Sequence, residues 1–170
     1  MQIIEGVVIG GNRLGRKLGF PTANIALSND CVVANGVYVS RVYVDGMEYG
    51  AMTNVGVRPS VDGSKRLLET HLFGFEGSLY GVQLRVKLLE KIRDEKKFSS
   101  VEELKDQIAK DKETVKSKLK MKNIERNLTM LCDFYELTMA NGYFSCGMKE
   151  KTVYFDVFFR QCPDNGGFAI

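Results

Sequence analysis

Short runs of alternating apolar and polar residues dominate the first half of the chain. In the clearest run, every second residue from 82 to 88 is Val or Leu. Alternation with a period of two is typical of a half-buried β-strand. An Asp45-Gly46 pair marks a tight hairpin turn between two other runs. Clear strands are predicted at Gln2–Ile9, Gly36–Val44, Met47–Val55, Arg66–Phe73 and Tyr80–Leu89, and Thr22–Leu27 can form a further short strand.

Turns, not helices, separate these strands, and this order predicts an antiparallel sheet that closes into a barrel. Parallel crossover connections need a dozen or more residues, which the short turns do not provide. The predicted strand Met47–Val55 ends near Gly56, and Arg58-Pro59 is expected to open a loop that reaches Lys65. The expected fold class is therefore mainly β.

Alternation divides the predicted strand Arg66–Phe73 into two faces, with Leu68, Thr70 and Leu72 on one of them. Alternation places Leu68 and Leu72 toward the core. Glu69 and His71 fall on the opposite face together with apolar neighbours, and we expect both to be half-buried at most.

A helix is predicted after the strands. Ser100-Val-Glu-Glu103 matches a capping box, and apolar residues follow at helical spacing from Val101 to Leu119. This helix is expected to lie on the barrel. Its distal part, Lys110–Lys122, is lysine-rich, which we interpret as a solvated face and not as a nucleic-acid or membrane patch.

Composition is that of an ordinary globular protein, with 44% hydrophobic and 26% charged residues among 170. The net charge of +3 is too small to indicate nucleic-acid binding. There is no signal peptide or membrane-length apolar run, and a single histidine excludes a multi-histidine metal site. The cysteines have no zinc-type spacing, so we expect reduced thiols in a cytoplasmic protein; they are Cys31, Cys132, Cys146 and Cys162.

The segment Gly15-Arg-Lys-Leu-Gly-Phe-Pro-Thr-Ala-Asn24 concentrates candidate chemistry. Its glycines let backbone N–H groups approach a ligand, and Arg16 and Lys17 can neutralise phosphate charge. The Thr22 hydroxyl and the Asn24 amide oxygen are hard ligands of the kind that Mg²⁺ accepts. The alternative is a flexible surface loop with solvated cations, because the segment matches no standard phosphate-loop motif.

This segment closely resembles the signature of riboflavin kinases. Four further pieces of that family follow in order, which are Asn54–Ser60, Glu69–Leu72, Leu79–Gly81 and Ile92–Phe98. The resemblance covers about residues 1–125 and implies a six-stranded Greek-key barrel. It also implies transfer of the terminal phosphate of ATP to the 5′-hydroxyl of riboflavin, giving FMN and ADP.

The resemblance implies roles for individual residues. Glu69 would be the general base, Arg93 would lie near the flavin, and Phe98 and Tyr80 could wall the flavin slot. Thr22 and Asn24 would hold Mg²⁺. The ATP-binding set would be Gly10, Gly15, Arg16, Gly19, Thr22 and Asn24.

Each of these residues also has a plain structural explanation. Taken alone, Thr22 is an ordinary strand residue, Asn24 a turn former and Glu69 a solvent-facing carboxylate. Arg93 could simply pair with Asp94 or Glu95, and Phe98 and Tyr80 suit a core. We expect His71 to be structural. The chain departs from the family at Gly74, where an Asp is common, without losing a residue assigned a role.

Residues 127–170 differ in character from the preceding domain, residues 1–126. The run Asn127–Tyr143, with Tyr135 placed near the nicotinate ring, resembles the amino-terminal helix of nicotinate phosphoribosyltransferases. Val153–Arg160 and Gly166–Ile170 resemble the strand and turn that follow it. We interpret this segment as a truncated start of such an enzyme without transferase activity. Alternatively, it folds as a helix and hairpin against the barrel.

Two other functions remain open at this point. The barrel could bind a flavin or nucleotide without turnover, or the chain could be the remnant of a fused phosphoribosyltransferase. The expected partners are riboflavin and ATP, with no nucleic acid and no membrane, and the chain is expected to be a monomer. FAD synthesis is not expected, because the His-x-Gly-His type motif of adenylylating relatives is absent from the sequence.

Overall fold

The computed structural model describes residues 2–28, 30–60, 63–138, 143–149 and 152–158. The chain divides into two compact units, residues 1–120 and 121–170, which we describe separately. Among the described residues, no helix is both long enough and apolar enough to cross a membrane.

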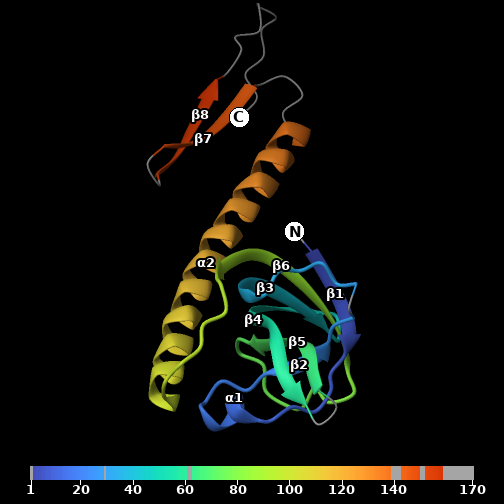
Figure 1. Cartoon of the computed structure of the whole chain (residues 1–170). Coiled ribbons are helices and arrows are strands. Elements are labelled where there is room, and N and C mark those ends of the chain that lie inside the picture. Colours follow the sequence, from blue (N-terminus) through green and yellow to red (C-terminus); the bar gives the residue numbers. More distant parts are fainter. Residues whose placement is uncertain (1, 29, 61–62, 139–142, 150–151, 159–170) are drawn as a thin grey trace, which may run out of the picture. The chain divides into compact units, whose positions relative to one another are not determined.

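Six antiparallel strands form the first unit, in the order β1-β6-β3-β4-β5-β2 (Figure 1). A bridge between Ile9 and Asn24 joins the segments at the two outer strands and nearly closes the sheet into a barrel. The mainly β fold with a C-terminal helix is therefore confirmed. The strands are β1 (Gln2–Val7), β2 (Ala23–Ala26), β3 (Gly36–Val44), β4 (Met47–Ser60), β5 (Gly63–Leu72) and β6 (Gln83–Arg93).

The hairpin of β4 and β5 is longer than predicted. The two strands pair from Ala51↔Leu72 to Ser60↔Gly63, so the prediction of a loop from Arg58 to Lys65 was wrong. The polar residues and the proline in this stretch do not alternate with apolar residues, so nothing in the sequence pattern indicated a strand there. The backbone pairing between β4 and β5 nevertheless continues through the stretch. The extension brings Arg58 alongside the strand that carries Glu69.

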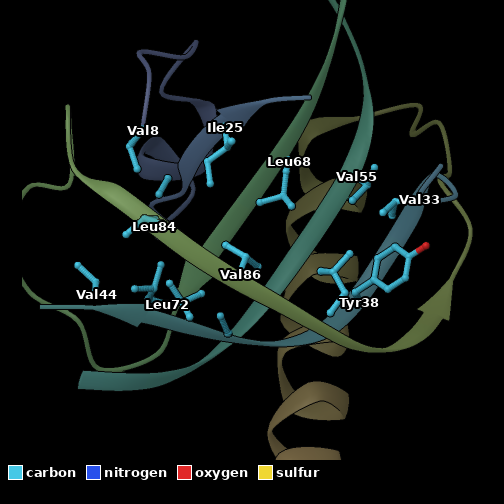
Figure 2. Packing of buried hydrophobic residues seen from close by; sticks show 14 residues of the cluster. Val8, Ile25, Val33, Tyr38, Val44, Val55, Leu68, Leu72, Leu84 and Val86 are labelled. Atoms are coloured by element: carbon cyan, nitrogen blue, oxygen red, sulfur yellow. The ribbon is translucent and has the colours of Figure 1, made fainter. Parts of the chain in front are cut away.

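Apolar side chains from strands β2 to β6, together with Val8 just beyond β1, fill the barrel (Figure 2). The alternation predicted for β6 is confirmed, since Leu84, Val86 and Leu88 are buried while Gln83 and Arg85 are exposed. Burying such side chains contributes about 1.5–3 kcal/mol each relative to leaving them in water.

A chain of hydroxyl groups crosses this apolar interior. Ser40 Oγ donates to the Ala51 carbonyl (2.9 Å) and lies 2.6 Å from Thr53 Oγ1. Thr53 Oγ1 in turn lies 2.7 Å from Thr70 Oγ1. All three hydroxyl residues are completely buried, so their hydrogen bonds are needed to offset desolvation. The chain ties β3, β4 and β5 together in one register.

The helix α2 (Val101–Thr138) begins in the first unit. Its start carries the predicted cap, with Glu103 N–H donating to Ser100 Oγ (3.1 Å). The Glu103 carboxylate accepts from the backbone and hydroxyl of Ser99, which lowers its pKa to about 2. Val115 and Leu119 are buried on the outer face of β3 and β4, in one cluster with Val37, Val39 and Met52.

The second unit contains the end of α2 and one hairpin. β7 (Tyr143–Lys149) pairs with β8 (Thr152–Phe158) in antiparallel register. β8 overlaps the predicted strand Val153–Arg160, whereas the predicted turn Gly166–Ile170 lies outside the described residues. α2 runs without interruption through the predicted domain boundary at residue 126. The division into domains at that residue stays a prediction.

Candidate functional site

A cavity of about 330 Å³ lies on the outside of the barrel wall, between β4, β5, the segment around α1 (Leu14–Lys17) and the first turns of α2. Its lining is mostly apolar and includes Leu18, Met52 and Ile108. Five of the predicted site residues line it, and they come from three separate stretches of sequence. These are Gly15, Thr22, Glu69, Arg93 and Phe98.

Glu69 stands at the centre of this wall. In the sheet it faces Asn24 on β2 and Asn54 on β4. Its Oε2 accepts hydrogen bonds from Arg58 Nη2 (2.6 Å), Arg58 Nε (3.0 Å) and Asn54 Nδ2 (3.4 Å). The side chain is 25% exposed, so the solvent-facing alternative does not describe it.

Sequence reasoning missed Arg58. Its guanidinium also donates to Glu95 Oε1 (3.0 Å), so one cation bridges two carboxylates. The pKa of Arg58 is raised: burial opposes the charge, but ion pairing with Glu69 and Glu95 outweighs it. A signal was present, because Arg58 lies eleven residues before Glu69 across a hairpin, but the hairpin was predicted to be shorter.

Thr22 and Asn24 lie next to each other at the start of β2, with Thr22 Oγ1 3.5 Å from Asn24 Oδ1. Asn24 is buried beneath Gly11, where a Cβ would come within 2.0 Å of Asn24 Nδ2. These two neutral oxygens fit Mg²⁺, which usually combines one or two protein ligands with phosphate oxygens and water. No group of three acidic, His or Cys side chains among the described residues could hold a metal by itself.

The loop before β2 winds through the short helix α1. Arg13 precedes α1 with a left-handed φ of 57°, and Gly19 follows it with a φ of +88°. At Gly15, a Cβ would lie 2.5 Å from the Phe20 carbonyl oxygen, so only glycine fits this tight loop. Gly10 and Gly19 have open space around them and do not line the described cavities.

A second hollow of about 70 Å³ lies on the other side of Thr22. Arg16, Thr22 and Tyr80 line it, so Thr22 forms part of the wall of both cavities. Tyr80 is 45% exposed there. It does not lie with Arg93 and Phe98, as expected for a wall of the flavin slot, because the turn before β6 places it beside Arg16 instead.

Arg93 reaches the helix and not only its sequence neighbours. Its Nη2 donates to Asp111 Oδ2 (2.6 Å) and its Nε lies 2.9 Å from the same oxygen. Gln107 Nε2 donates to the other oxygen of Asp111, which is 5% exposed. The side-chain ion pair of Arg93 is therefore with Asp111, and Asp94 accepts a hydrogen bond from Arg93 Nη1 through its backbone carbonyl (2.8 Å).

His71 is buried, with 6% exposure, and so the expectation of half burial was wrong. Edge-on contacts with Phe20 and Phe73 cover the ring, and Lys112 lies over both aromatic faces. His71 Nδ1 is 2.8 Å from the Pro21 carbonyl, and donates to it. Desolvation lowers the pKa of the imidazole, and the lysines of α2 lower it further.

Comparison with known proteins gives concordant matches for the first unit. A family model described as riboflavin kinase matches residues 2–119. A bifunctional riboflavin kinase/FMN adenylyltransferase of Haemophilus influenzae is 46% identical over 115 residues, covering 67% of this chain and 37% of the relative. The Bacillus subtilis protein of the same name is 38% identical over 114 residues, covering 65% and 36%. The chain thus matches little more than a third of these relatives.

A solved structure has the same fold. The crystal structure titled macrolide-efflux protein from Streptococcus pneumoniae superposes with a TM-score of 0.61 at 38% identity. The superposition covers 67% of this chain and 38% of that one.

Proposed function

Because this chain belongs to the riboflavin kinase family, we propose that it transfers the γ-phosphate of ATP to the 5′-hydroxyl of riboflavin, giving FMN and ADP. One observation carries the proposal. A carboxylate, Glu69, and a candidate metal ligand, Thr22, line the same cavity, and Thr22 also lines the adjoining hollow. A phosphoryl donor and a hydroxyl acceptor could therefore meet at Thr22.

Glu69 is proposed as the general base. A hydroxyl that attacks phosphorus loses its proton, and a positioned carboxylate can accept it. Since Oε2 of Glu69 is occupied by Arg58 and Asn54, the acceptor would be Oε1. The new O–P bond then forms as the bond to the bridging oxygen of ADP breaks, and the proton stays on Glu69 until water removes it.

The nucleotide is proposed to bind on the Arg16 side of Thr22. Phosphoryl transfer requires positioning and charge neutralisation more than covalent chemistry. Arg16 would neutralise phosphate charge, and the loop at Gly15 and Gly19 would bring backbone N–H groups close. Thr22 and Asn24 would hold Mg²⁺, which when bound supplies positive charge to the phosphate oxygens.

The flavin is proposed to occupy the larger cavity. Its volume of about 330 Å³ falls within the range of about 300–1,000 Å³ that is typical of small-molecule sites. Phe98 and Ile108 offer apolar surface for a flat ring. Arg93 would contribute an N–H edge while remaining fixed by Asp111.

The activity proposed here is the kinase reaction alone. The names of the relatives also include adenylylation of FMN, but those proteins are nearly three times as long as the region that matches this chain. We further propose, from sequence resemblance only, that residues 127–170 are the start of a nicotinate phosphoribosyltransferase without activity. Pyrophosphate release that depends on nicotinate should then be absent. Monomeric state and a cytoplasmic location likewise stay predictions.

The test is FMN formation from riboflavin, ATP and Mg²⁺, followed by chromatography. The parent should form FMN, and Glu69→Gln should lose about 10²–10⁴-fold in rate, as expected for removal of a general base. Glu5→Gln is the matched control, because Glu5 is another strand carboxylate paired with an arginine, Arg85 (3.1 Å). Riboflavin binding without any FMN would instead favour a binding module without turnover.

A further inference from the structure

The contact between Arg58 and Glu69 is asymmetric. Arg58 directs Nε and Nη2 at a single carboxylate oxygen, Oε2, instead of spreading them over both. Asn54 adds a third donor to the same oxygen. In the part of the chain that the structure describes, no group donates to Oε1. The two oxygens of one carboxylate therefore have different surroundings.

This asymmetry has a chemical consequence. An oxygen that accepts three hydrogen bonds, two of them from a cation, has no free lone pair for a further proton. An oxygen on the same carboxylate without donors keeps its lone pairs. The rigidly spaced donors of the guanidinium, together with Asn54, hold Oε2 in place. Arg58 thus determines which oxygen of Glu69 is available.

Arg58 is itself held in place. Its Nη1 donates to Glu95 Oε1 (3.0 Å) and to the Val57 carbonyl (3.1 Å). Glu95 in turn accepts from Asn35 Nδ2 (3.2 Å). Gly56 makes room for this arrangement, since a Cβ there would lie 1.9 Å from Glu95 Oε1. The network therefore extends from the cavity wall to the segment that follows β6.

We propose that Arg58 is a positioning residue for the kinase reaction: it anchors Oε2 of Glu69 so that Oε1 faces the substrate hydroxyl. The inference rests on the proposed function. Arg58 gives up and gains no proton in this role. The hydroxyl proton passes to Glu69, and the arginine keeps its hydrogen bonds throughout.

The experiment measures kcat and the riboflavin dissociation constant for Arg58→Met and Arg58→Lys, each in the parent chain and in the Glu69→Gln background. Misplacing a catalytic group by about 1 Å can cost about 100-fold in rate. We expect Arg58→Met to lower kcat by about 10- to 100-fold and to change riboflavin binding less than about twofold. Arg58→Lys keeps the charge but not the fork, so it should recover only part of kcat.

The Glu69→Gln background provides the decisive comparison. If Arg58 acts through Glu69, Arg58→Met should lower kcat by less than about twofold once Glu69 is already Gln, because coupled residues are not additive. An equal loss in both backgrounds overturns the proposal while leaving the general base intact. A parent chain that forms no FMN overturns the proposed function and this inference together.

Two further variants separate positioning from folding. Glu95→Gln weakens the support of Arg58 without touching Glu69, and it should lower kcat by about threefold to tenfold with unchanged riboflavin binding. Arg85→Met removes an exposed arginine–glutamate pair elsewhere on the barrel and should leave kcat unchanged. If Glu95→Gln behaves like Arg85→Met, Arg58 is not held in the way proposed.

Discussion

The ion pair between Arg93 and Asp111 connects β6 to the first part of α2 and should be essential for docking the helix. Asp111 is 5% exposed and receives three donors within 3.0 Å, two from Arg93 Nε and Nη2 and one from Gln107. Breaking a fully buried pair costs about 3–5 kcal/mol. The Arg93 side chain is 24% exposed, so water can solvate it again in part, and we expect about 2–3 kcal/mol for Asp111→Ala.

Thermal unfolding of the full chain, followed by circular dichroism, checks this value. For a unit of this size, 1 kcal/mol corresponds to roughly 4 °C, so the midpoint should fall by about 8–12 °C. Asp106→Ala is the control, since Asp106 lies on the same helix but is exposed, and it should stay within about 0.5 kcal/mol of the parent. The double replacement Arg93→Met with Asp111→Leu should recover part of the loss, because apolar side chains need no partner.

A drop of less than about 2 °C for Asp111→Ala would refute this reasoning. It would mean that Arg93 finds water or another acceptor as easily as it finds Asp111. A double replacement no more stable than Asp111→Ala would refute the electrostatic part alone, and would point to lost packing instead.

Three other outcomes follow from the structure. The pKa of His71 is lowered in the folded chain, so the unfolded chain binds this proton first as the pH falls below about 6.5. The free energy of unfolding should therefore fall with a slope of up to about 1.4 kcal/mol per pH unit. Urea unfolding of His71→Gln should show a shallower pH dependence than the parent, and parallel curves would contradict this prediction. Glu103→Gln should have a lower midpoint of thermal unfolding than the parent at pH 7. The difference between the two midpoints should disappear as the pH falls from 4.5 toward 2, because the lowered pKa of Glu103 is about 2. A difference that persists at low pH would show that the cap does not depend on charge. Gly11→Ala should force Asn24 aside and cost about 1–3 kcal/mol in thermal unfolding, whereas Gly10→Ala, which meets nothing within 4 Å, should not.

Much of the barrel could be predicted because alternation is a local signal. The strict pattern of β6 and the Asp45-Gly46 turn each depend on neighbouring residues only, and both are found as expected. The predicted loop after Gly56 failed for the opposite reason. Residues there pair with β5 along the backbone although their side chains show no alternation.

The candidate site was only partly predictable. The loop signature located Thr22 and the motif Glu69–Leu72 located Glu69, and the structure brings both to one cavity. It could not indicate Arg58, whose contact with Glu69 depends on the length of the hairpin. Nor could strand periodicity indicate the burial of His71, because Phe20 from the preceding loop covers it only in three dimensions.

The buried hydroxyl chain constrains how this barrel can change during evolution. The Ala51 carbonyl can only accept, so the donors run in one direction, from Thr70 to Thr53 to Ser40 to Ala51. Replacing Thr53 alone with an apolar residue strands the Thr70 proton, at a cost of about 1–3 kcal/mol, whereas exchanging all hydroxyls for apolar groups of the same shape can be nearly neutral. Changing the hydroxyl residues to apolar residues one at a time therefore passes through less stable intermediate sequences. Residues 40, 53 and 70, although far apart in sequence, should change together.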